Sequence, residues 1–386
     1  MRRARISVVA YFGVLGVANG VWLARIPAIK QHLHLSDSLL GLALLAAPAG
    51  MVIAVPLAGR IVHKAGSRLP VVAAGSCAVL APILMGVAAS LAALMAGLLA
   101  FGFAGGILDV GMNSQAVHVE RGCGRPLMSS FHACFSFGGL AGALLGGAFA
   151  WAEVGPMVNF TAVGIPLALI ALLAGRWLLP DRLGADDRPQ TTASGQTGQP
   201  PRRMTTLLLV LALLAICSLL GEGAAEGWSA VYLRDNLHTA AAFAALGYAG
   251  FSVAMACGRL SGDRLAAWLG PAAVLRYCGL MAAAGLAIAL LSGNPVAAIA
   301  GFTLFGAGLS CTFPLMLSAA GNADPLRPAH GIARVAGFGY IGMLGGPVLI
   351  GALAGQLGLA MALAVPVLLA LVVAAGAGAV RQRTSG

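Results

Sequence analysis

Two carboxylates lie four residues apart in an otherwise apolar stretch of this chain. A helix would place Glu222 and Glu226 on one face. An acidic side chain at the centre of a lipid bilayer costs roughly 2.5–3.5 kcal/mol on insertion scales, so such residues are rare without a use. Two like charges at this spacing repel each other, and such a pair can take up and release a proton. The pair predicts proton coupling, unless the helix ends near Ala225 and Glu226 is simply in water.

A second polar group has the same spacing. Asp109 and Asn113 are four residues apart, Gln115 follows, and His132 begins the next apolar stretch. We expect these side chains to form a polar cluster at the inner mouth of a cavity. A lightly perturbed histidine titrates near physiological pH. The alternative for His132 is a structural hydrogen bond to the neighbouring loop.

The first apolar stretch echoes the segment around Glu226 and Trp228, because Asn19 is followed by a glycine and then by Trp22. We expect Asn19 to hydrogen-bond a solute and Trp22 to stack on it. Trp22 would otherwise be an interfacial anchor. Arg25 either pairs with an acid near the outer end of the helices or extends its charged end towards water.

The sequence contains no signature of metal or enzyme chemistry. The seven cysteines show no metal-binding spacing, and GxSxG, HExxH and GxxxxGK[ST] are all missing. We therefore expect no metal, no cofactor and no catalytic residue. The chain is not predicted to be an enzyme.

The amino-acid composition indicates that most of the protein's surface is in contact with lipid. Of the 386 residues, 59% are hydrophobic and only 9% are charged, whereas a soluble domain has about 25% charged residues. The 54 glycines suit close packing of helices within a membrane. The net charge of +11 lacks the soluble basic patch that nucleic-acid binding needs, so no nucleic-acid partner is expected.

Apolar stretches near 20 residues can each cross about 30 Å of hydrocarbon. The sequence predicts an all-α membrane protein with twelve such spans: Ile6–Leu23, Leu39–Ala58, Pro70–Ala88, Leu91–Val110, Ser130–Ala150, Met157–Gly175, Leu207–Ala225, Ala240–Ala256, Pro271–Leu291, Pro295–Leu317, Gly331–Leu353 and Gly358–Val380.

Basic residues predict the orientation, since Lys and Arg favour the cytoplasmic side. With twelve spans, all of the 23 Lys and Arg residues except Arg25, Lys30 and Arg234 fall on one side. A wrong number of spans would scramble this separation. Both termini are therefore expected in the cytoplasm.

The chain also divides into two similar halves. Residues 180–204 are polar and contain several Pro, Gly, Thr, Asp and Gln residues, which is typical of a flexible linker. It would join a half at 1–179 to a half at 205–386. One constant offset relates Gly59-Arg60 to Gly258-Arg259, Gly102-Phe103 to Gly301-Phe302, Gly138 to Gly337, and Gly146-Gly147 to Gly345-Gly346. Two such halves rocking about a central site would give alternating access.

The segment from Gly59 to Arg68 resembles the loop signature of the major facilitator superfamily. That signature has an acidic residue where this chain has His63, which puts the usual gate role in doubt here, whereas the second copy retains Asp263. The resemblance covers nearly the whole chain and implies that helices 1 and 7 line a central cavity. It implies gating or helix-packing roles for Gly59, Arg60, Gly66, Arg68, Gly258, Arg259 and Asp263.

The fifth predicted span resembles the antiporter motif of the same superfamily. It contains Gly138, Gly142, Gly146 and Gly147, with Ala143 at the position of the motif's proline. These glycines equally suit plain helix packing. The arginine that drug–proton antiporters carry in the fourth span is missing.

Residues 109–115 and 222–229 look like the fucose-permease-like branch of bacterial inner-membrane members. This resemblance implies a monomer in the lipid bilayer that moves a small solute, such as a sugar, together with protons or another ion. Efflux antiport of drugs or metabolites is the alternative. A sensor or scaffold that does not transport is a third interpretation, and it predicts that neutralising the buried acids changes nothing.

Overall fold

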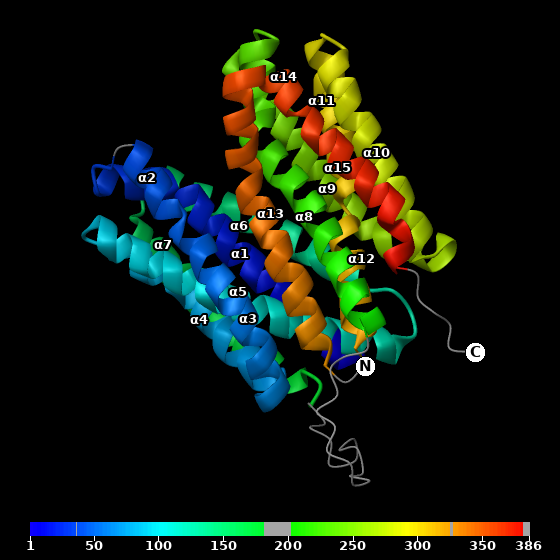
Figure 1. Ribbon diagram of the computed structural model, residues 1–386. Coiled ribbons are helices and arrows are strands. Elements are labelled where there is room, and N and C mark those ends of the chain that lie inside the picture. Colours follow the sequence, from blue (N-terminus) through cyan, green and yellow to red (C-terminus); the bar gives the residue numbers. More distant parts are fainter. Residues whose placement is uncertain (36, 181–201, 325–326, 381–386) are drawn as a thin grey trace. The chain divides into compact units, whose positions relative to one another are not determined.

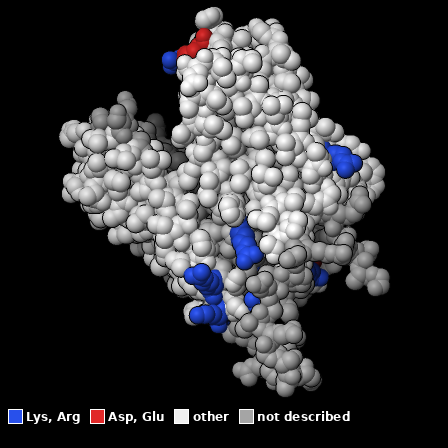
Figure 2. Space-filling model, in the orientation of Figure 1, with Lys and Arg blue, Asp and Glu red and all other residues white. Residues whose placement is uncertain are grey.

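The computed structural model describes residues 1–35, 37–180, 202–324 and 327–380, which contain helices and no strands (Figure 1). Within these residues, 11 helical stretches are long and apolar enough to cross a membrane. Helix α9 (Ala241–Leu269) lies where the remaining predicted span was expected, and its second half carries Arg259, Asp263 and Arg264. Charged groups cover little of the surface that Figure 2 shows.

The described residues form two compact units. Unit 1 comprises Met1–Cys123, Cys134–Leu208 and Ala323–Ala333, and unit 2 comprises Gly124–Ala133, Leu209–Asn322 and Arg334–Gly386. The predicted linker lies almost entirely outside the described residues. The predicted domain boundaries and the cytoplasmic placement of both termini therefore stay predictions.

Unit 1 is organised around one long helix. Helix α5 (Leu91–Cys123) packs against its neighbours α3 and α4, and α1 packs against α4 and α7. The elements are α1 (Arg2–His32), α2 (Asp37–Leu44), α3 (Ala46–Ala65), α4 (Arg68–Gly86), α6 (Met128–Trp151), α7 (Pro156–Ala174) and the 3₁₀ turn η1 (Gly175–Trp177).

Unit 2 repeats this plan, with α11 packed between α9 and α10, and α15 against α10. The elements are α8 (Arg202–Val231), the π-helical turn η2 (Tyr232–Asn236), α10 (Pro271–Leu291), α11 (Pro295–Leu309), α12 (Thr312–Ala323), α13 (Pro328–Leu357), α14 (Leu359–Ala362), α15 (Ala364–Ala375) and the 3₁₀ turn η3 (Gly376–Val380).

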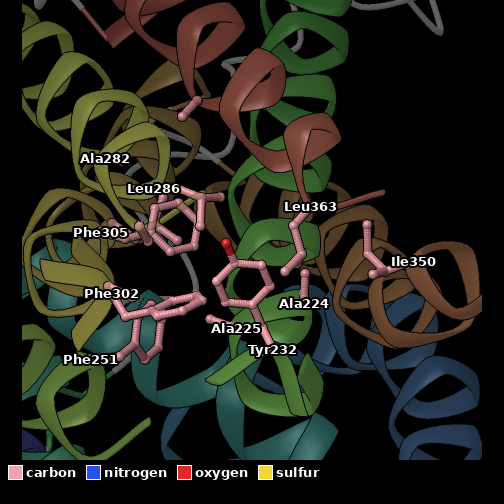
Figure 3. Packing of buried hydrophobic residues seen from close by; sticks show 14 of the residues in the cluster. Ala224, Ala225, Tyr232, Phe251, Ala282, Leu286, Phe302, Phe305, Ile350 and Leu363 are labelled. Carbon is pink, nitrogen blue, oxygen red and sulfur yellow. The ribbon is translucent and has the colours of Figure 1, made fainter. Parts of the chain in front are cut away.

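Aromatic rings fill the centre of unit 2. The rings of Tyr232 and Phe302 lie 6.2 Å apart between centroids, and those of Phe251 and Phe305 lie 5.8 Å apart. Figure 3 shows these rings gathered beside Ala225. The Tyr232 hydroxyl donates to the Leu290 carbonyl, so its polar end is satisfied. This aromatic cluster packs against the half of α8 that carries the acids.

Several helices are longer than predicted. Helix α5 continues to Cys123 instead of ending at Val110, and α9 continues to Leu269 instead of Ala256. The segment from Gly258 to Arg264 is therefore helical and not a loop. His63, His118 and His330, which lie outside the predicted apolar spans or at their edges, are on α3, α5 and α13. Hydropathy marks only the apolar part of a helix, so its polar end escapes detection.

The glycines of α6 pack against α1. A Cβ atom on Gly138 would lie 2.5 Å from the Gly13 carbonyl oxygen, and one on Gly146 would lie 2.7 Å from Ala24 Cβ. Gly142 meets the backbone of Val17 in the same way. Only a hydrogen atom fits at these positions, which accounts for three of the four predicted glycines by close helix packing. Gly147 is exposed and faces open space.

Candidate functional site

The acidic pair lies within a continuous helix. Helix α8 extends to Val231, so Glu226 lies inside the helix and not beyond its end. Glycines flank both acids, and the helix continues through them. These glycines let α13 approach, because a Cβ atom on Gly223 or Gly227 would lie 3.3 or 3.4 Å from Pro347. The indole nitrogen of Trp228 donates to the Pro347 carbonyl over 3.0 Å and fixes the same contact.

Glu222 is paired with a buried base on the neighbouring helix. Its Oε1 atom lies 3.6 Å from Nη2 of Arg259, and the two side chains are 14% and 10% exposed. Nε of Arg259 also donates to the carbonyl of Ser310 over 3.4 Å. The predicted gate residue Arg259 is therefore the charge partner of the predicted proton-coupling residue Glu222. A buried charge is tolerated when it is paired in this way.

Glu226 has a different environment from Glu222. It is solvent-accessible, and Oε1 accepts a hydrogen bond of 3.2 Å from the hydroxyl of Tyr248 on α9. The Tyr248 ring stacks against Phe251, with centroids 6.1 Å apart. An ionisable group on a membrane helix faces the protein interior or a water-filled space, because lipid would not solvate it. Glu222 and Glu226 thus present one buried and one accessible carboxylate on the same face of α8.

Asp263 lies one turn beyond Arg259 on α9 and caps another helix. Its two carboxylate oxygens accept hydrogen bonds from the backbone N–H groups of Ser129 and Ser130, at 2.9 and 2.8 Å. These groups open α6, where a negative charge is favoured by the helix dipole. Gly262 permits the contact, since a Cβ atom there would lie 2.8 Å from Ser129 Cβ.

His132 lies one turn into α6 and is buried. Its ring meets Phe313 edge-on, with centroids 6.1 Å apart, and the ring lies near the Arg259 guanidinium. In unit 2, His132 therefore belongs to the surroundings of the Glu222–Arg259 pair.

The structure brings Asp109 and Asn113 together on α5. The side-chain amide of Asn113 donates to both the backbone carbonyl and the carboxylate of Asp109, at 2.8 and 3.0 Å. Gln115 makes other contacts, because its amide bonds to the Ser67 hydroxyl and to the backbone of Leu179. Gln115 thus joins α5 to the start of α4 and to the residues that follow η1.

Trp22 differs from both expectations for it. It is 4% exposed and packs in the core of unit 1, with its ring centroid 6.4 Å from that of Phe160 on α7. It is neither at an exposed interface nor open for stacking on a solute, because this face of α1 is covered by α7. Asn19, one turn earlier, is half-buried.

The first copy of the loop signature is built differently from the second. Arg60 and Arg68 are exposed, and Arg68 donates to the Gly175 carbonyl over 3.1 Å. Gly66 has φ of 77°, which favours glycine. At the acidic position of the motif, the His63 ring meets His330 edge-on, with centroids 5.1 Å apart.

Several parts of this site escape prediction from the sequence. Tyr248 and Ser310 stand in no motif, and nothing in the spacing joins Arg259 to Glu222. One signal was available: an arginine followed four residues later by an acid, directly after an apolar stretch, is compatible with a helix that continues. Among the described residues, no group of three or more His, Cys, Asp or Glu side chains is placed to hold a metal.

Residues 8–327 match the sequence model of the Major Facilitator Superfamily. The chain belongs to this superfamily. It is 35% identical over 378 residues to an MFS-type transporter of Yersinia pestis, covering 98% of this chain and 96% of that protein. The protein is accordingly a transporter and not an enzyme, and it lies in the bacterial inner membrane as a multi-pass protein.

Solved structures of superfamily members share its fold. The fucose:proton symporter FucP of E. coli superposes with a TM-score of 0.78 at 18% identity, covering 98% of both chains. The proton:xylose symporter XylE superposes with a TM-score of 0.73 at 13% identity, covering 96% of this chain and 94% of its own. At these identities the likeness establishes the all-α superfamily fold alone.

Proposed function

We propose that this transporter takes up a small polar, sugar-like solute together with a proton, and that Glu222 and Glu226 carry the proton. The observation that supports the proposal most is the ion pair between Glu222 and Arg259. The energy of a buried ion pair changes strongly when one member loses its charge. Proton occupancy at Glu222 is therefore tied to the position of Arg259.

The geometry suggests an order of events. Glu226 is accessible, so it exchanges protons first and can pass one along the same face of α8 to Glu222. Once Glu222 is protonated, its neutral carboxylic acid no longer pairs with the Arg259 guanidinium. The guanidinium can then donate to hydroxyl oxygens of a solute. Loss of the proton re-forms the pair and ends this contact. Solute binding and proton binding would thus favour each other.

The fold neighbours support the choice of solute and ion. FucP and XylE are symporters of a sugar with a proton. Within unit 1, Asp109 and Asn113 form a buried hydrogen-bonding pair of the kind that a polar solute needs. Three of the four glycines that favoured antiport pack against α1, which supports plain helix packing at these positions over efflux.

Transport by purified protein tests the proposal. The protein is reconstituted in liposomes that contain a pH-sensitive dye, and a panel of sugars and other polar solutes is added outside. We expect one solute class to drive protons in the same direction as the solute, and Glu222→Gln to abolish this flux. Glu153→Gln, at an exposed acid between α6 and α7, is the control and should transport normally.

The outcomes are distinct. Proton movement opposite to the solute would replace symport by antiport. Full flux in Glu222→Gln would remove Glu222 from the mechanism. Solute uptake without any proton movement would contradict proton coupling itself.

A further inference from the structure

A buried arginine lies at the start of α7 without an acidic partner among the described side chains. Arg25, on α1, is only 4% exposed. Its Nη2 atom donates to the carbonyl of Val154, a neutral group, and its Nε atom has no hydrogen-bond partner. A buried cation is normally compensated by an anion, because burial removes its water shell.

The beginning of α7 adds donors to the same place. Val154 directly precedes Gly155, the N-cap residue, which provides no side-chain cap, and Pro156 follows. The backbone N–H groups of Met157 and Val158 consequently have no partner inside the helix. Such an N-terminus carries a partial positive charge and favours anions.

A fully buried amide lies in the same first turn. Both polar atoms of the Asn159 side chain, Nδ2 and Oδ1, lack hydrogen-bond partners, although the residue is 0% exposed. Helical side chains tilt towards the N-terminus, which directs Asn159 to the start of α7. The next residue, Phe160, contacts Trp22, which lies one turn before Arg25. Arg25 and Asn159 therefore belong to one junction between α1 and α7.

Gly155, at the start of α7, is exposed, and the acid nearest to it in the chain is turned outward. A Cβ atom on Gly155 would meet nothing within 4 Å. Glu153, one residue before Val154, is also exposed, with a left-handed φ of 57°. The junction thus offers a guanidinium, an amide and backbone N–H groups close to the exposed Gly155.

We propose that this α1–α7 junction binds an oxyanion, a carboxylate or phosphate group, between Arg25, Asn159 and the start of α7. The planar guanidinium and the helix N-terminus both match the geometry of such a group. The anion belongs either to a free small molecule or to a lipid headgroup. This site lies in unit 1, whereas the acids of the proposed proton site lie in unit 2, so the two proposals fail independently.

Thermal unfolding of the full-length protein in a neutral detergent tests the site. Inorganic phosphate and acetate are titrated at constant ionic strength, with chloride as the reference salt. For the unaltered protein we expect a saturable rise of roughly 2–4 °C in the unfolding midpoint. Arg25→Gln and Asn159→Leu should abolish the rise. Arg276→Gln, at an exposed arginine on α10, should retain it.

A second arm identifies the source of the anion. The same variants are placed in nanodiscs of phosphatidylcholine with or without phosphatidylglycerol. Stabilisation by phosphatidylglycerol that requires Arg25 assigns the site to a lipid headgroup, and a response to phosphate or acetate alone assigns it to a free anion. Arg25→Lys keeps the charge and serves if Arg25→Gln does not fold; it should bind more weakly. Equal responses in the unaltered protein and in the Arg25 and Asn159 variants, or no response in either arm, would overturn the proposal.

Discussion

Oε1 of Glu222 on α8 lies 3.6 Å from Nη2 of Arg259 on α9, and both side chains are nearly buried. Water solvates neither charge well, so each depends on the other. Removing one member of a buried pair typically costs about 3–5 kcal/mol, whereas removing both together costs far less. This dependence gives the pair a signature that can be measured without knowing the solute.

Glu222→Gln and Arg259→Gln should each lower the unfolding midpoint in detergent, by an amount corresponding to about 3–5 kcal/mol. The double variant should be more stable than the sum of the single losses predicts, because it buries no unpaired charge. Tryptophan fluorescence during heating follows all four proteins. Additive losses would show that the two residues are not coupled.

Tyr248→Phe should slow coupled transport several-fold without abolishing it. The change removes the hydrogen bond to Glu226 over 3.2 Å but leaves the ring contact with Phe251. Initial rates of solute-driven proton uptake into liposomes measure the effect. Glu226→Gln should be more severe, since it removes the accessible carboxylate. If both variants transport at the original rate, the proposed entry of protons through Glu226 is excluded.

Asp263→Ala should destabilise the start of α6. The carboxylate satisfies two backbone N–H groups there, and loss of such a cap costs roughly 0.5–2 kcal/mol. Hydrogen exchange of the peptides that cover residues 128–135 should speed up in the variant. Asp235→Ala is the matched control, because Asp235 is exposed and pairs with the adjacent Arg234. Unchanged exchange in Asp263→Ala would mean that the cap contributes nothing.

The fold follows from the sequence because lipid imposes strict rules on composition and length. Apolar stretches of the right length predict the helices, and the residues from Gly59 to Arg68 carry the resemblance to the superfamily. The ends of α5 and α9 escape this prediction, since helices of membrane proteins continue into polar sequence where hydropathy falls.

The site is harder to predict than the fold. Spacing places Glu222 and Glu226 on one face, but their partners Arg259 and Tyr248 come from α9, and only tertiary packing brings these helices together. The burial of Trp22 is equally hard to predict. A tryptophan at this position suggests contact with a solute or with the membrane interface, but the neighbouring helix α7 covers its side chain. A residue's environment on a helix depends on which helix packs against that face, and a single sequence does not contain this information.

Adjacent glycines on α6 provide a test of close helix packing. Gly146→Ala places a methyl group 2.7 Å from Ala24 Cβ and 3.2 Å from the Val21 carbonyl oxygen, so α1 and α6 must separate. Overpacking of this kind typically costs about 1–3 kcal/mol.

Gly147→Ala adds the same methyl group to open space. It should leave stability unchanged or raise it by about 0.5–1 kcal/mol, because alanine has less backbone freedom to lose in a helix. Unfolding midpoints of the two variants, prepared side by side, measure the difference. Equal effects at both positions would show that the packing of α1 against α6 does not depend on backbone contact at Gly146. The antiporter-like interpretation of these glycines would then be favoured over plain helix packing.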